Sequence, residues 1–124
     1  MIDIEEAMVM IRLKRIYEEA SADDGKRVLV DRVWPRGVSK EEARLDEWMR
    51  AVAPSPDLRK WFGHDPERFD EFKEAYEKEL SESAERQEAV EQLRDWSEEG
   101  TVTLLYAAKD ETHNHVVVLK AFLE

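Results

Sequence analysis

Residues 27–37, which read RVLVDRVWPRG, decide how the rest of this chain is expected to fold. The run from Val28 to Val30 is aliphatic without polar alternation, which indicates a strand buried on both faces, as in an α/β sheet. Pro35 cannot donate to a strand ladder and Gly37 tolerates unusual dihedral angles, so strand pairing should end there. The charged residues at this point lie where open α/β sheets bind ligands. The stretch therefore predicts a buried strand whose end forms part of a ligand-binding site.

Composition limits the classes of protein to which the chain can belong. Its 124 residues are 42% hydrophobic and include four tryptophans, enough for one domain, residues 1–124, with its own core. The absence of cysteine excludes disulfides and thiolate chemistry. The net charge of −11 opposes binding to nucleic acid or to an anionic membrane. The acidic N-terminus lacks the pattern of a signal peptide, so we expect a cytoplasmic protein.

Two further segments have the composition of strands. Residues 8–13 should form the first strand and pair with the strand at residues 28–33, after a loop that turns at Asp24 and Gly25. Residues 101–107 should form a third strand, apolar on both faces. Because helices separate the second strand from the third, a parallel pair with a right-handed crossover is the simplest topology. Both strands then end at the same edge of the sheet.

The rest of the chain is predicted to be mostly helical. A capping box of Ser39 and Glu42 should begin a helix that ends near residue 53. A Pro at the first helical position indicates two more helices, and the valines of the last segment fit a nearly buried helix better than a strand. The expected later helices span residues 56–62, 65–80, 83–99 and 116–123. The predicted fold class is α/β, with a short, mostly parallel sheet of about three strands flanked by four to five helices.

Polar side chains gather at the two predicted strand exits. Arg32 and Arg36 offer forked donors suited to a phosphate or carboxylate, and Lys109 adds a third charge. A histidine paired with an aspartate could act as an acid or base near neutral pH, with the arginines stabilising negative charge. The expected catalytic residues are His64, His113, Asp31 and Asp110, and the expected ligand-binding residues are Arg32, Arg36, Trp34, Trp61, Lys109, Asn114 and His115.

Each of these residues also has a structural interpretation. Asp31 and Arg32 can form an ion pair that joins the strand to the loop, and a tryptophan in such a loop is often a packing residue. Asp110 with Asn114 fits a helix N-terminus, where an acid caps free amides. His113 and His115 would point about 200° apart on a helix and could not share an ion, so no metal and no cofactor are expected.

Three long runs resemble the YeaO-like family of small bacterial proteins. They are RVLVDRVWPRGVS at residues 27–39, APSPDLRKWFGHDPERF at 53–69 and TLLYAAKDETHNHVVVL at 103–119. The resemblance implies an α/β fold and a cytoplasmic setting in bacteria or archaea, and it brings no assigned activity. The chain departs from the family where residues 18–20 replace a more proline-rich segment. The hallmark residues implied are Asp31, Arg32, Trp34, Pro35, Arg36, Gly37, Trp61, Phe62, His64, Asp110, His113, Asn114 and His115.

Three functional hypotheses remain open at this level. The first is a pocket for a small phosphate or carboxylate ligand, with acid-base chemistry of a hydrolase or transferase. The second is the same pocket in a non-catalytic module that binds a metabolite or nucleotide. The third is an architectural interaction domain, although the acidic surface of residues 67–99 would make a poor hydrophobic interface. The sequence predicts neither an oligomeric state nor whether the chain is an enzyme.

Overall fold

A four-stranded sheet forms the centre of the computed structural model, which describes residues 10–124. Its strands lie in the order β1-β4-β2-β3. Their bounds are β1 Ile11–Arg15, β2 Lys26–Leu29, β3 Glu47–Trp48 and β4 Val102–Tyr106. All neighbouring strands are parallel. The predicted α/β class is confirmed, while the expected number of about three strands was one too few.

The order of the strands differs from the expected order in one respect. β1 pairs with β4, with Leu13 opposite Leu104, and not with the strand at residues 28–33. All of β4 is buried, whereas most of β1 keeps contact with solvent. The more apolar strand therefore takes the central position and leaves β1 at an edge. Residues 8 and 9, at which the first strand was expected to begin, lie outside the described residues.

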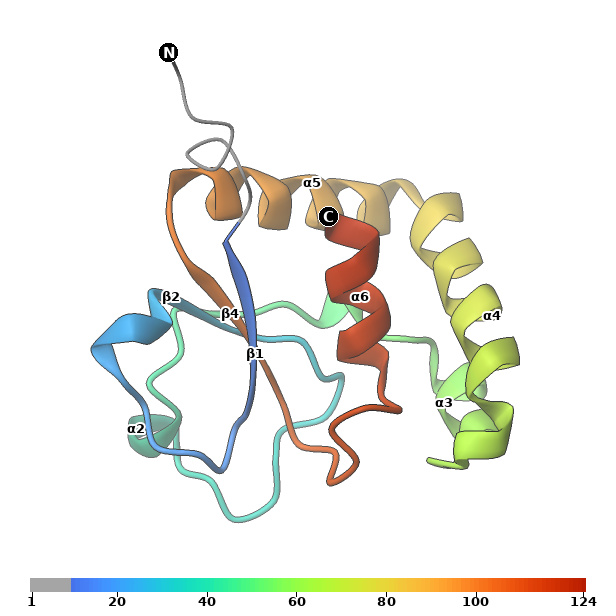
Figure 1. Cartoon of the computed structure of the whole chain (residues 1–124), viewed down its shortest axis with the longest axis horizontal. Coiled ribbons are helices and arrows are strands. Elements are labelled where there is room, and N and C mark those ends of the chain that lie inside the picture. Colours follow the sequence, from blue (N-terminus) through green and yellow to red (C-terminus); the bar gives the residue numbers. More distant parts are fainter. Residues whose placement is uncertain (1–9) are drawn as a thin grey trace.

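Five helices surround the sheet in the part of the chain that the structure describes. In Figure 1, α5 crosses the end of the sheet at which β1 and β4 begin. No helix within residues 10–124 is both long enough and apolar enough to cross a membrane. The helices are α2 Lys40–Ala43, α3 Pro56–Phe62, α4 Phe69–Glu82, α5 Ala84–Glu99 and α6 His115–Leu123, with 3₁₀ turns η1 Ala22–Asp24, η2 Arg50–Val52 and η3 Pro66–Arg68.

The helix expected from Ser39 to about residue 53 is a single turn, α2. It begins at the predicted capping box and ends at Arg44, whose backbone is left-handed with φ 48°. The backbone N–H groups of Asp46 and Met49 then donate to carbonyl oxygens of β2 at 2.8 Å. Pairing with the free edge of β2 therefore replaces the longer helix and adds β3 to the sheet.

Two apolar clusters pack against opposite faces of the sheet. The larger cluster holds Val28 and Leu104 against the helices α4, α5 and α6, with Tyr76 fully buried within it. The next residue along each strand points to the other face, so Leu29 and Leu105 belong to the smaller cluster. Two tryptophans, Trp34 and Trp48, pack against that smaller cluster. Both faces of the central strands are therefore covered, and only the strand ends are open to ligands.

Candidate functional site

A cleft of about 620 Å³ opens at the edge of the sheet where β1, β2 and β4 end. The loops that follow these three strands form part of its wall, and residues 53–64, which include α3, form the rest. Eight residues predicted from the sequence line it: Asp31, Arg32, Trp34, Arg36, His64, Lys109, Asp110 and His115. The parallel topology brings them together because every parallel strand ends at the same edge.

Asp31 and His115 form a half-buried pair on the wall of this cleft. The Nε2 atom of His115, the first residue of α6, lies 3.4 Å from Oδ1 of Asp31 and 3.0 Å from the carbonyl oxygen of Val30. The other carboxylate oxygen of Asp31 accepts the backbone N–H of Ala107 at 2.9 Å. This pair therefore ties the end of β2 to both the end of β4 and the start of α6.

Burial shifts the pKa values of this pair in opposite directions. It raises the pKa of Asp31 and lowers the pKa of His115, because a charged group loses its hydration in the interior. The attraction between the two side chains opposes both shifts but is the smaller influence on each. Arg59 and His64 also act on both groups through their charge. Those two residues therefore belong to the same electrostatic environment.

The four permanent cations of the cleft differ in what holds them. Arg32 donates to the carbonyl oxygens of Pro54 at 3.2 Å and Ala53 at 3.4 Å, so it joins the loop after β2 to the segment before α3. Arg36, Arg59 and Lys109 are exposed. Within residues 10–124 the charged groups of these three side chains have no hydrogen-bond or salt-bridge partner. They are the groups that remain available to an anion.

The predicted ion pair between Asp31 and Arg32 is replaced by other contacts. Asp31 faces His115, and Arg32 faces backbone carbonyl groups. The indole Nε1 of Trp48 donates to the backbone oxygen of Asp31 at 2.7 Å, and that of Trp34 donates to Val38 at 2.7 Å. The loop after β2 is thus held by a hydrogen bond within the loop and by hydrogen bonds to β3 and to the segment before α3, which fixes the positions of the groups that it presents to the cleft.

The loop after β4 is organised by a carboxylate, as the structural interpretation expected. Asp110 accepts the backbone N–H groups of Thr112 at 2.9 Å and His113 at 3.0 Å. These two hydrogen bonds lower the pKa of Asp110 to about 2. The N-cap of α6 is Asn114, whose side chain accepts from the N–H of Val117. Asp110 therefore caps the loop after β4, whereas Asn114 caps the helix α6.

Three predicted site residues lie outside the cleft. His113 contacts the Asp110 carboxylate at 3.0 Å and packs edge-on against Phe69. Trp61 is exposed on α3 and stacks with the Arg68 guanidinium. Asn114 lines a recess of about 70 Å³ that shares Arg59, His64 and His115 with the cleft. Within residues 10–124, no three His, Asp or Glu side chains are grouped to hold a metal ion.

Two polar residues that line the cleft, Arg59 and Tyr17, were not predicted. Arg59 lies on α3, within the helix predicted at residues 56–62, from which only Trp61 was proposed as a site residue. Tyr17 follows β1, which also ends at this edge, so its position after a parallel strand was the signal that could have found it. Its hydroxyl donates to the backbone oxygen of Arg36 at 3.0 Å. The first strand therefore contributes to the site as well as the second and the fourth.

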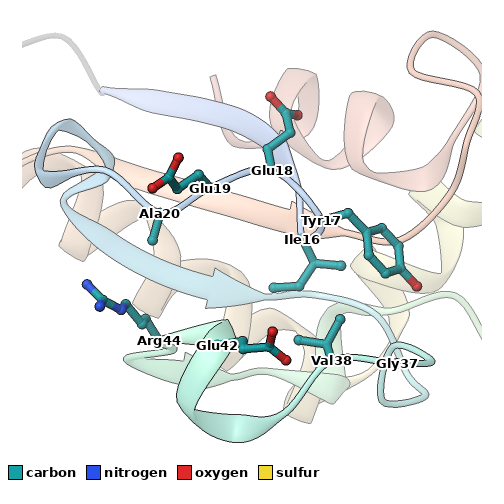
Figure 2. Close-up of a pocket in the computed structure, with 9 residues that line it drawn as sticks. All are labelled: Ile16, Tyr17, Glu18, Glu19, Ala20, Gly37, Val38, Glu42 and Arg44. Carbon is teal, nitrogen blue, oxygen red and sulfur yellow. The ribbon is translucent and has the colours of Figure 1, made fainter.

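A second cavity of about 350 Å³ lies between the loop after β1 and α2. Figure 2 shows Ile16 and Val38 on facing sides of it, while the Tyr17 ring is directed away from Glu19 and Arg44. Two of its carboxylates are already occupied. Glu18 accepts the backbone N–H of Arg15, and Glu42 accepts that of Ser39. The residues that depart from the family pattern, 18–20, line this cavity and not the cleft.

Comparison with known proteins gives one family and several relatives. The model DUF488-N3i, described as the inactive DUF488-N3 subclade, matches residues 10–124. The chain is 43% identical over 113 residues to the uncharacterized protein Rv3073c of Mycobacterium tuberculosis, covering 91% of this chain and 92% of the relative. It is 42% identical over 113 residues to the uncharacterized protein YeaO of Escherichia coli, covering 91% and 96%. No solved structure matches the chain significantly. The YeaO-like resemblance is thereby confirmed.

Proposed function

Because the chain belongs to the YeaO-like family whose matching model is described as the inactive DUF488-N3 subclade, we propose that it binds a small anion without converting it. The anion carries a phosphate or a carboxylate and occupies the cleft at the C-terminal ends of the strands. The setting that we propose is the cytoplasm, which the cysteine-free composition favours. The partner is a small molecule, and neither nucleic acid nor a membrane is part of the proposal.

Arg36, Arg59 and Lys109 support anion binding most directly. They line one cleft and their charged groups have no partner within residues 10–124. In a protein with a net charge of −11, such a concentration of cations creates a local potential opposite to that of the whole surface. The two carboxylates of the cleft, Asp31 and Asp110, offset this charge only in part, because with Arg32 the cleft is lined by four cations.

The catalytic alternative is a hydrolase or transferase that uses a histidine and an aspartate as acid and base. The Asp31 and His115 pair favours that alternative by its chemistry. Its geometry favours a structural role, because the same Nε2 atom that faces Asp31 also lies 3.0 Å from the Val30 carbonyl oxygen. The family description, which contains the word inactive, agrees with binding and not with turnover.

Thermal unfolding against a panel of anions tests the proposal. The panel contains inorganic phosphate, sugar phosphates, nucleotides and small carboxylates. A ligand at about 100 times its Kd stabilises the native state by about 2.7 kcal/mol, which shifts the midpoint by roughly 8 °C. We expect one class of anion to produce this shift in the wild type and a much smaller shift in Arg36→Ala and Arg59→Ala.

Two exposed cations outside the cleft provide matched controls. Lys60 neighbours Arg59 on α3 and Lys40 begins α2, and neither lines the cleft. Lys60→Ala and Lys40→Ala change the net charge equally and should keep the full shift. If no anion in the panel stabilises the wild type, or if all four variants respond alike, the proposed pocket is wrong. Measured turnover of a bound anion, lost in His115→Gln, would establish the catalytic alternative instead.

A further inference from the structure

The residues that line the cleft include two chemically different groups. Arg59, His64 and His115 line both the cleft and the recess of about 70 Å³ that shares these residues with it. Tyr17, Val33, Trp34 and Pro35 line the cleft but not the recess, and we call their surface the apolar end of the cleft. The first group offers charge and hydrogen bonds, whereas the second offers mainly apolar surface. A ligand that fills the cleft therefore meets both kinds of surface.

The volume of the cleft exceeds what a bare anion requires. At about 620 Å³ it lies in the range of pockets that hold drug-sized molecules. A phosphate or acetate ion would leave most of the apolar end in contact with water. Tyr17 is 48% exposed and Val33 is 58% exposed, so this end has apolar surface that a ligand can still cover.

The two aromatic rings at the apolar end are fixed in place. The Tyr17 hydroxyl donates to the backbone oxygen of Arg36 at 3.0 Å, and the Arg15 guanidinium packs over its ring at 5.0 Å from the centroid. Trp34 donates to Val38 and meets Trp48 edge-on with centroids 5.2 Å apart. Tyr17 lines both cavities, and Figure 2 shows its ring directed away from Glu19 and Arg44. Rings held in this way bind a flat partner at a low cost in entropy.

Building on the proposed function, we infer that the ligand is an aromatic or heteroaromatic anion. Its phosphate or carboxylate head lies toward Arg59, and its ring packs beside Tyr17 and Trp34. Arg36 and Lys109 stand along the cleft as further cations. The proposed function requires a phosphate or carboxylate head, and the further requirement made here is an aromatic ring.

Isothermal titration calorimetry with paired probes tests this inference on the full chain. The pairs are phenyl phosphate against inorganic phosphate, and benzoate against acetate, at fixed pH and ionic strength. The wild type should bind one aromatic probe at least tenfold more tightly than its bare partner. In Tyr17→Ala that ratio should fall toward one while the affinity for the bare anion stays unchanged. In Arg59→Gln both affinities should fall by a similar factor, so that the ratio is kept.

Further variants separate loss of the ring from loss of the fold. Tyr17→Phe keeps the ring but loses its hydrogen bond to the backbone of Arg36, so it should keep most of the ratio. Val33→Ser should lower the ratio in part without touching a buried group. Trp61→Ala removes an exposed aromatic residue outside the cleft and should change nothing. If an aromatic probe and its bare partner bind equally, or if the ratio survives in Tyr17→Ala, the inference is wrong and the proposed function stands. If none of the four probes binds, the inference is wrong, and the wider panel of anions decides the proposed function.

Discussion

Nε2 of His115 lies 3.4 Å from Oδ1 of Asp31 and joins the first residue of α6 to the exit of β2. The same nitrogen lies 3.0 Å from the carbonyl oxygen of Val30, which requires an N–H at Nε2 to form a hydrogen bond. One side chain thus connects a helix start with a strand end 85 residues earlier in the chain. The pair is placed both to hold the cleft together and to respond to what binds there.

His115→Ala should lower the free energy of unfolding by about 2–4 kcal/mol, because it leaves a cavity and two oxygen atoms without their donor. His115→Gln keeps an N–H donor near the position of Nε2 and should recover at least half of that loss. Urea unfolding followed by far-UV circular dichroism measures both values. Equal destabilisation by the two variants would mean that the donor at Nε2 contributes little and that packing alone is lost.

The stability of the wild type should decrease as the pH falls below about 6.5. Burial lowers the pKa of His115 in the folded protein below its usual value of 6.5. Between these two pKa values the unfolded chain binds more protons than the folded chain, so acid favours unfolding. Burial raises the pKa of Asp31, and this carboxyl acts in the opposite sense, above its usual pKa of 3.8.

Unfolding measured from pH 7.5 to pH 5 checks this dependence. His115→Gln carries no titrating group at this position and should show a smaller loss of stability with acid than the wild type. Trp61→Ala is the control, because it removes an exposed side chain that does not titrate and lies outside the cleft, and it should keep the slope of the wild type. An unchanged slope in His115→Gln would assign the dependence to other groups.

The sequence predicted most of the charged residues that line the cleft, because the positions of most of them follow from a simple topological rule. Asp31, Arg36, Lys109 and His115 stand after strands whose parallel pairing sends their ends to one edge. Arg59 could not be predicted in this way, since its role depends on where α3 lies relative to the sheet. Tertiary position, and not local pattern, decides which exposed helical cations face a cleft.

The predictions of the fold were wrong where pairing with an element distant in the sequence overrides the structure that the local sequence favours. Trp48 and Met49 have helical spacing from Leu45, yet the free edge of β2 provides backbone partners that a surface helix would not. The predicted strand order was wrong for a similar reason, because β4 pairs with both β1 and β2, which lie far from it in the sequence. Capping signals predicted the starts of helices correctly, as at Ser39, since they depend only on residues that are close in the sequence.

Gly25→Ala should destabilise the protein more than Gly37→Ala. Both glycines have positive φ, 62° and 78°, which costs a residue with a Cβ about 1–2 kcal/mol. A Cβ at Gly25 would in addition overlap the carbonyl oxygen of Thr101, whereas a Cβ at Gly37 would meet nothing within 4 Å. We expect a midpoint of thermal unfolding lowered by only a few degrees in Gly37→Ala and by clearly more in Gly25→Ala. Equal midpoints would show that the chain around Thr101 adjusts freely.

Arg32→Ala and Arg36→Ala should separate the structural part of the loop after β2 from its binding part. Arg32 is held by the carbonyl oxygens of Pro54 and Ala53, so its loss should lower stability by about 1–2 kcal/mol. Arg36 is exposed and its guanidinium has no partner within residues 10–124, so Arg36→Ala should stay within about 0.5 kcal/mol of the wild type. Urea unfolding without added anions measures both.

The same two variants respond differently to an anion that stabilises the wild type. Arg36→Ala should lose most of the ligand-induced rise in the midpoint although its fold is intact, because a cation that contacts only the ligand contributes only when the ligand is bound. Arg32→Lys keeps the charge but loses the planar fork, and should fall between Arg32→Ala and the wild type in stability. If Arg36→Ala is as unstable as Arg32→Ala and responds fully to the anion, the loop after β2 is architectural throughout. Anion binding in the cleft would then depend on Arg59 and Lys109, and not on Arg36.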